Sequence, residues 1–212
     1  MIDYTPIFRS PITPIPHPTS HIPHPTSHIP HLKSLISNLK LSDLTGVPVM
    51  LIQGEVDDIL KQHFAQIPAK PGDLVEVSGG LLARLTATQF YLFGLSLAAN
   101  LPSAATVDDS FAQNQRFAHA TDITHGQAVL RLAGLAASEV LSKICGLDFH
   151  QTIFPSQHVA QTSAAKIKTL IARYDEGETP TYFLHVNRPL GQYFWETVWD
   201  AGQEFEITTA DR

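Results

Sequence analysis

The residues of this 212-residue chain that could carry out acid–base chemistry gather in one short segment. Asp122 and His125 lie three positions apart, and a carboxylate that orients an imidazole can move protons near neutral pH. The segment is also typical of a turn, because Asp and Thr side chains bond to nearby backbone and Gly126 permits a positive φ. We favour the turn, and we identify no catalytic residue in this chain.

Two arginines are the candidate cofactor-binding residues. Arg131 interrupts an otherwise apolar strand, where alternation would direct it toward solvent or a ligand. Arg188 lies between the end of a predicted strand and the start of a predicted helix, and a helix N-terminus favours anions. Each could equally be a solvated surface charge.

The thiol and the imidazoles outside the N-terminal tract give no metal or redox site. Cys145 is the only cysteine, which excludes an intrachain disulfide and any multi-cysteine metal site. It ends an apolar helix, where a buried and inert thiol is expected. His150 and His158 flank Phe154-Pro155 without a carboxylate or thiolate partner, so we predict no metal site there.

The N-terminal tract differs from the rest of the chain. The heptapeptide P-H-P-T-S-H-I occurs at 16–22 and again at 23–29, and most of the 15 prolines lie nearby. Proline removes backbone donors, and the tract has few large apolar groups, so residues 1–40 are predicted to be a disordered tail. Its five histidines lack supporting residues that would orient them, which predicts weak, adventitious metal affinity at most.

Composition and missing motifs exclude several classes of function. The formal net charge is −6 and no basic block exists, so no nucleic-acid partner is expected. No apolar run could span a bilayer and no secretory signal is visible, so we expect no membrane partner and a cytoplasmic location. Dinucleotide-binding, P-loop, zinc-helix and nucleophile-elbow motifs are absent. Charged residues make up only 16% of the chain, which favours a surface partly covered by another protein.

The hydrophobic periodicity predicts an α+β fold of two similar halves, 41–118 and 119–206, with a C-terminal tail at 207–212. Each half reads strand, glycine, helix, strands, helix, and we expect the halves to share one continuous sheet or core. Gly54 and Gly134 occupy the same joint, where glycine allows a tight turn and close helix–strand packing. The predicted strands are 47–53, 74–77, 81–86, 90–93, 128–133, 157–164, 167–173 and 181–186, and the predicted helices are 55–66, 103–117, 135–145 and 189–202.

The final helix offers the clearest candidate for a partner interface. It carries an apolar stripe at helical spacing, formed by Leu190, Phe194, Val198 and Ala201. Trp195 and Trp199 form an adjacent stripe, and Tyr193 adds further aromatic surface. Such a helix is either deeply buried or offers one face to a partner, since Trp and Tyr are enriched at interfaces.

The second half closely resembles the gamma subunit of heterotetrameric sarcosine oxidase. In that family, a strand ending in R-L-S-G is followed by P-A-A-x-x-V-L-x-K, a cysteine and L-D-L-H. Here the corresponding run is V-L-R-L-A-G-L-A-A-S-E-V-L-S-K-I-C-G-L-D-F-H at 129–150. Further matches follow in order at 154–155, 160–162, 182–186, Arg188, Trp195 and 204–205, and the first half matches more loosely. The resemblance covers about residues 40–206, and it departs at Leu135, where the family usually has proline.

This resemblance implies membership of the glycine-cleavage T-protein and folate-binding superfamily. It implies a non-catalytic subunit of an oxidoreductase complex that demethylates sarcosine to glycine. FAD, FMN and NAD would lie in larger flavoprotein subunits, with none bound by this chain alone. The alternative is a stand-alone folate-binding, aminomethyltransferase-like protein of one-carbon metabolism, in which Arg131 and Arg188 bind the glutamate carboxylates of tetrahydrofolate.

Overall fold

A computed structural model describes residues 38–209 of the chain. The predicted N-terminal tail therefore lies almost entirely outside the described residues. The first half contains β1 (Lys40–Asp43), β2 (Val49–Gln53), α2 (Asp57–His63), β3 (Leu74–Val77), β4 (Gly80–Thr86), β5 (Gln89–Gly94) and α3 (Ala104–Gln113). The second half contains β6 (His119–Asp122), η1 (Thr124–Gly126), β7 (Gln127–Ala133), α4 (Ala137–Ile144), β8 (His158–Ala164), β9 (Ile167–Arg173), β10 (Thr181–Asn187), η2 (Arg188–Leu190), α5 (Gly191–Gly202), η3 (Gln203–Phe205) and β11 (Thr208–Thr209).

The predicted α+β fold with two similar halves is confirmed, and every predicted strand and helix is present with ends shifted by a few residues. Three short strands, β1, β6 and β11, were not predicted. The fold takes in Leu39 and Ile207, which the sequence assigned to the two tails, because both side chains pack into the core beside α5. These strands are too short for alternation to reveal, and they form because distant strands pair with them.

The strands form two sheets. One sheet has the order β3-β4-β5-β2-β6, and the other has the order β11-β1-β7-β10-β9-β8. The opening strands are exchanged between the halves, since β1 pairs with β7 and β6 pairs with β2, both antiparallel. Each half therefore supplies a strand to the sheet of the other half, which ties the two halves together.

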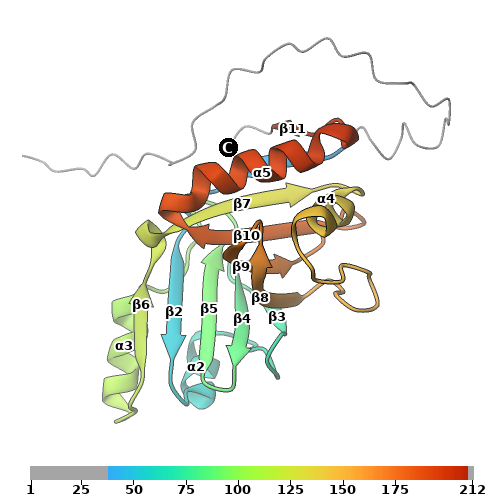
Figure 1. The fold of residues 1–212 in the computed structure, drawn as a ribbon. Coiled ribbons are helices and arrows are strands. Elements are labelled where there is room, and N and C mark those ends of the chain that lie inside the picture. The colour runs from blue at the N-terminus through green and yellow to red at the C-terminus, as the bar shows by residue number, and fades with distance from the viewer. Residues whose placement is uncertain (1–37, 210–212) are drawn as a thin grey trace, which may run out of the picture.

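The two sheets pack face to face, with their strands crossing (Figure 1). They do not form one continuous sheet, although backbone bonds from Leu74 N to Gln157 O and from Val159 N to Gly72 O join them at one edge. A cluster of buried residues between the sheets is shared by both halves, so the expected common core is present. It includes Val47, Val49, Leu81, Tyr91, Phe93, Val129, Leu170 and Phe183.

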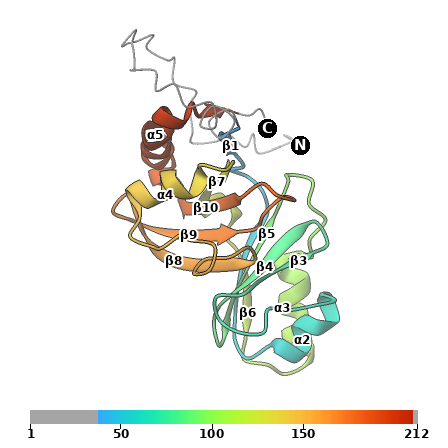
Figure 2. The ribbon, with the colours of Figure 1, turned by 90° about the vertical axis from the view of Figure 1, so that its right-hand side faces the viewer.

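Helices cover the two outer faces (Figure 2). The helices α2 and α3 bury Ile59, Leu60, Val107 and Phe111 against the first sheet. On the opposite side, α4 and α5 bury Val140, Leu141, Phe194 and Val198 against the second sheet. Each sheet is therefore covered by helices on its outer face and by the other sheet on its inner face. This arrangement removes the apolar surface of both sheets from water.

Gly54 and Gly134 do occupy equivalent joints, but the close approach there is to a strand rather than to a helix. Both have a positive φ, of 134° and 137°. A Cβ on Gly54 would lie 2.5 Å from the Cβ of Ala118, just before β6, and one on Gly134 would lie 2.7 Å from the carbonyl oxygen of Asn38, just before β1. Both glycines therefore make room for the strand that enters from the other half.

Candidate functional site

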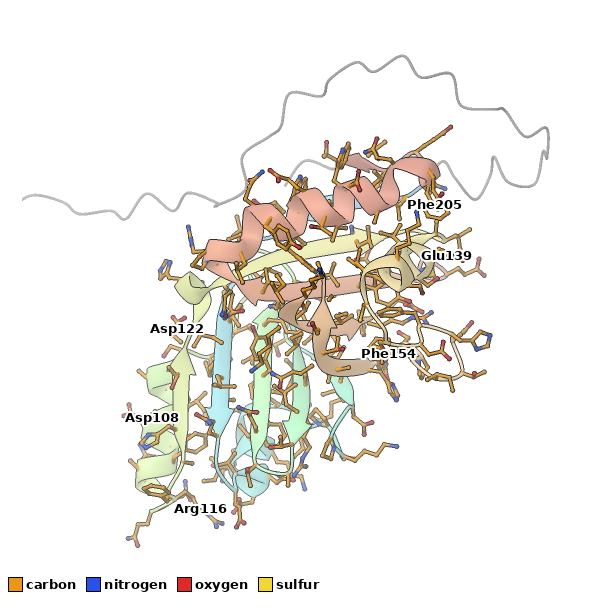
Figure 3. The ribbon with its side chains drawn as sticks, viewed as in Figure 1. Asp108, Arg116, Asp122, Glu139, Phe154 and Phe205 are labelled. Carbon is orange, nitrogen blue, oxygen red and sulfur yellow. The ribbon has the colours of Figure 1, made fainter. Side chains whose placement is uncertain are left out.

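The polar segment at 122–126 is a turn, as favoured from the sequence. The Asp122 Oδ1 accepts a hydrogen bond from the Thr124 backbone N–H at 2.8 Å, and Thr124 Oγ1 accepts one from Val49 N–H at 2.9 Å. Asp122 lies at the end of β6 that is nearer to the second sheet (Figure 3). Gly126 does not use a positive φ, because the turn continues as the short helix η1. The Asp122 carboxylate thus holds the local backbone together.

The same device occurs in the other half, at the turn after β1. Asp43 Oδ1 accepts a hydrogen bond from Thr45 N–H at 2.8 Å, and Thr45 Oγ1 accepts one from Val129 N–H at 3.1 Å. In both halves an Asp-x-Thr turn therefore connects an exchanged strand to a central strand. The repeat of D-L-T and D-I-T was the sequence signal for this duplication, and sequence reasoning missed it.

The structure does not bring the two candidate cofactor-binding arginines together. The Arg131 guanidinium forms a two-point ion pair with Glu176, with Nε 3.0 Å from Oε1 and Nη2 bonded to Oε2. Glu176 lies in the hairpin before β10, whereas Arg188 follows β10 at its other end. Arg131 is thus held away from Arg188, and this pair does not fit the joint binding of one folate glutamate.

The aromatic residues of α5 divide between core and surface. Trp195 is only 8% exposed and packs in the core under α5, so its predicted place at an open partner interface is wrong. Trp195 lies three residues before Val198, and residues three apart share a helix face, so its ring is turned toward the sheet beside Val198. Trp199 is partly buried against the same core. Tyr193 is exposed, and its hydroxyl donates a hydrogen bond to Ala165 O at 3.1 Å.

The remaining sequence candidates have structural roles. Cys145 is a buried free thiol, as predicted. His150 Nδ1 pairs with Thr152 Oγ1 at 2.8 Å, and His158 Nδ1 lies 3.4 Å from Ser156 O. Within residues 38–209, no three His, Cys, Asp or Glu side chains gather where they could hold a metal ion. No helix in the same range is long and apolar enough to cross a membrane.

The most unusual polar group in the described structure is His185, which sequence reasoning did not single out. It lies on β10 between the two sheets, where its ring contacts the rings of Phe93 and Tyr91 at centroid distances of 4.5 and 5.2 Å. Its Nδ1 is 3.2 Å from the Tyr91 hydroxyl. The available signal was a histidine in the middle of the apolar run Y-F-L-H-V.

Burial controls the ionisation of His185 and Tyr91. Loss of solvation lowers the pKa of His185 from its ordinary 6.5 to about 3, and it raises the pKa of Tyr91 above its ordinary 10. Both groups are therefore neutral at physiological pH. When the Tyr91 hydroxyl donates to Nδ1, the ring proton lies on Nε2, a buried atom that makes no hydrogen bond within the described residues.

Two arginines at equivalent positions brace the outer layers. Arg84 on β4 forms a two-point ion pair with Asp57 on α2, and its guanidinium lies 4.9 Å from the centroid of the Phe90 ring. Arg173 on β9 forms a two-point ion pair with Asp175 and lies 5.6 Å from the Tyr182 centroid. Arg173 also donates to Phe154 O at 2.7 Å. Both guanidinium groups are already paired with carboxylates that fix a helix or a loop, so we assign these arginines a structural role.

The described surface has two hollows that differ in size and lining. A pocket of about 50 Å³, beside the start of α3, is lined by apolar residues together with Asp122 and Thr124. An open hollow of about 620 Å³ is lined by charged residues of α2, by Arg84, by Ala87 and Thr88 of the β4–β5 turn, and by Arg116. Arg116 follows α3 and is labelled in Figure 3. Within the open hollow Arg84 pairs with Asp57 and Arg116 pairs with Asp58, so its charges largely neutralise one another.

Two solved structures have a fold similar to that of this chain. A chain of heterotetrameric sarcosine oxidase from Corynebacterium sp. U-96, solved in complex with pyrrole 2-carboxylate, is similar with a TM-score of 0.68 and 22% identity. That match covers 81% of this chain and 87% of the other, so the two chains have similar lengths. The glycine cleavage system aminomethyltransferase T from Bartonella henselae is similar with a TM-score of 0.62 and 13% identity.

The match to the aminomethyltransferase covers 84% of this chain but 49% of the other, so this chain spans about half the length of that protein. At 22% and 13% sequence identity, the similarity to these two structures establishes the fold alone. A search of curated proteins gave no match. The sequence model of the GCVT N-terminal domain family matches residues 62–211, well over half of the sequence. The chain therefore belongs to the GCVT N-terminal domain family.

Proposed function

We propose that this chain is a non-catalytic, gamma-type subunit of a sarcosine oxidase-like complex. The complex would demethylate sarcosine oxidatively to glycine and pass the one-carbon unit to tetrahydrofolate. The observation that carries this proposal is the near full-length likeness to one chain of a heterotetrameric sarcosine oxidase, with similar length on both sides. By contrast, this chain spans only about half of the aminomethyltransferase.

In this proposal the chain itself holds no cofactor, and two hollows of the described residues bear on that point. Sites for drug-sized ligands and cofactors commonly enclose about 300–1,000 Å³ of largely apolar space. Here the pocket beside α3 is about 50 Å³, and the larger hollow is open and lined by paired charges. These residues do not fit a flavin or a nicotinamide nucleotide, so in this proposal FAD, FMN and NAD are held by larger flavoprotein subunits.

The partner surface in this proposal lies on the outer side of α5. Of the three aromatic residues predicted there, Trp195 is in the core, which leaves Tyr193 and the partly buried Trp199. Tyr193 is 48% exposed, and Leu190, one turn earlier, is 37% exposed. A tyrosine beside apolar surface is a common anchor at protein interfaces because it buries a large ring and keeps a polar end.

The experiment that tests the proposal is affinity purification of the tagged full chain from its native cells, followed by absorption spectroscopy and mass spectrometry. We expect a yellow eluate in which larger chains are present in fixed ratio, and we expect it to consume oxygen when sarcosine is added. A Tyr193→Asp variant should reduce the co-purified flavin, whereas Phe117→Asp should not. Phe117 is 96% exposed on the α3–β6 connection, far from α5, and so is a matched control.

A colourless eluate that contains this chain alone as a stable monomer would contradict the proposal. That result would favour the second candidate, a stand-alone folate-binding protein related to aminomethyltransferases. The second candidate is favoured by membership of the GCVT N-terminal domain family. Titration calorimetry of the purified chain with tetrahydrofolate tests it. No heat up to millimolar ligand would remove this candidate, and saturable heat that Arg188→Ala abolishes would support it.

A further inference from the structure

A buried titratable pair lies between the sheets in the described part of the chain, and it joins the two halves. Tyr91 belongs to β5 in the first half and His185 belongs to β10 in the second half. Their hydrogen bond crosses from one sheet to the other, and both side chains are at most 5% exposed. A change at either group therefore acts on the contact between the halves.

We propose that His185 is an acid-sensitive clasp, which holds the two sheets together through Tyr91 while neutral and loosens their packing when it is protonated. Among residues 38–209, the side chains found against the His185 ring carry no negative charge that would stabilise an imidazolium. Phe93 packs against the ring, and the paired positions on β7 and β9 are Val129 and Leu170. A buried cation without an anionic partner is strongly unfavourable.

The charged groups nearest along the packed strands do not relieve this cost. Two positions along on the same faces, β7 carries Arg131 and β9 carries Lys168, and both are cationic. Arg131 is already paired with Glu176 outside the intersheet core. From β5 the titratable group that faces His185 is Tyr91, which burial keeps neutral. Protonation of His185 thus adds an unpaired charge and leaves the Nε2 hydrogen without an acceptor.

The direction of the pH effect follows from the two states of the chain. The unfolded chain has an ordinary histidine, with pKa near 6.5, whereas burial lowers the folded pKa to about 3. The unfolded state therefore binds a proton more readily at every pH between these values. The contribution of neutral His185 to the free energy of unfolding is fully present above about pH 7, and it is lost as the pH drops through 6.5 toward 3. Between pH 7.5 and pH 5 this residue alone raises the unfolding equilibrium constant ~30-fold.

Urea unfolding of the full chain between pH 8 and pH 4.5 tests the clasp. The variant His185→Phe carries the residue found at the equivalent position of the first half. Between pH 7.5 and pH 5, we expect its unfolding equilibrium constant to rise ~30-fold less than that of the wild type. The matched control is His119→Phe, because the His119 side chain is 70% exposed, and it should follow the wild-type profile within a few-fold. Identical pH profiles for His185→Phe and the wild type would overturn the proposal.

A second measurement keeps the proposal testable if His185→Phe does not fold. In the wild-type chain, the imidazole resonances of His185 should stay at their neutral values down to pH 5. The variant Tyr91→Phe should be less stable at all pH values and keep its acid dependence, because the buried imidazole remains. Titration of His185 near pH 6.5 in the folded protein would show that it is not a buried clasp.

Discussion

Phe93 in the first half and His185 in the second half stand at the same place in the repeat. Each is the fifth residue of its strand, β5 or β10, and each pairs with the equivalent valine, Val49 or Val129. Across the sheets, Tyr91 meets His185 and Phe93 meets Phe183, with ring centroids 5.2 and 5.6 Å apart. One crossing of the pseudo-symmetric core is therefore polar, and the other is apolar.

The same comparison separates features that the fold needs from features that one half has acquired. Gly54 and Gly134, the Asp-x-Thr turns, and Arg84 and Arg173 are present in both halves, and each positions a strand or braces a layer. Arg131 and His185 have apolar counterparts in the first half, Leu51 and Phe93. These two differences both lie on the inner face of the second sheet, where the second half carries a polar side chain and the first half an apolar one.

The largest expected effect comes from the paired glycines. We predict that Gly134→Ala and Gly54→Ala each destabilise the chain by about 3 kcal/mol or more, because a Cβ would overlap the incoming strand and the positive φ is strained for alanine. If the halves are equivalent here, the two losses agree within about 1 kcal/mol. Urea denaturation measures both free energies of unfolding.

Gly146→Ala is the control for the glycine variants. This residue follows α4 without a positive φ, and a Cβ there would meet nothing within 4 Å. Its replacement should change stability by less than about 0.5 kcal/mol. A loss at Gly146 as large as that at Gly134 would mean that strand exchange does not explain the glycines.

The two bracing arginines should give an intermediate and unequal effect. Arg173→Met leaves Asp175 partly buried without its cation and removes the bond to Phe154 O, so we predict a loss of about 3 kcal/mol. Arg84→Met should cost less, about 1–2 kcal/mol, because its partner Asp57 has a side chain 42% exposed to water. Equal losses, measured by denaturation at neutral pH, would show that burial does not distinguish the two braces.

Much of this fold was predictable because its long strands and helices carry their own patterns. The strand 167–173 and the apolar face of α5 follow directly from alternation and helical spacing. The exchanged strands β1 and β6 were not predictable, since four residues carry too little periodicity and their partners lie far away in sequence. The exchange of β1 and β6 between the halves depends on tertiary contacts, and local strand propensity does not predict it.

The candidate site was predicted less well, because a residue type does not reveal its partner. Arg131 was correctly placed on a strand, but no sequence pattern indicates that Glu176 pairs with its guanidinium. Trp195 was assigned to a partner interface because aromatic residues suit both cores and interfaces. His185 was overlooked because a histidine inside an apolar strand becomes informative only when the facing residue, Tyr91, is known.

The smallest expected effect concerns the two Asp-x-Thr turns. Thr45 is 1% exposed and Thr124 is half-buried, yet their hydroxyls accept the same kind of bond, from Val129 N–H and Val49 N–H. We predict that Thr45→Val costs about 1.5 kcal/mol, because it leaves a buried backbone donor without a partner. Thr124→Val should cost about half as much, since water can reach the exposed end of that turn. Serine at either position keeps the hydroxyl and should recover most of the loss. A Thr45→Val variant as stable as the wild type would show that the Thr45 hydroxyl bond contributes little, and the duplicated turn would then act mainly through packing.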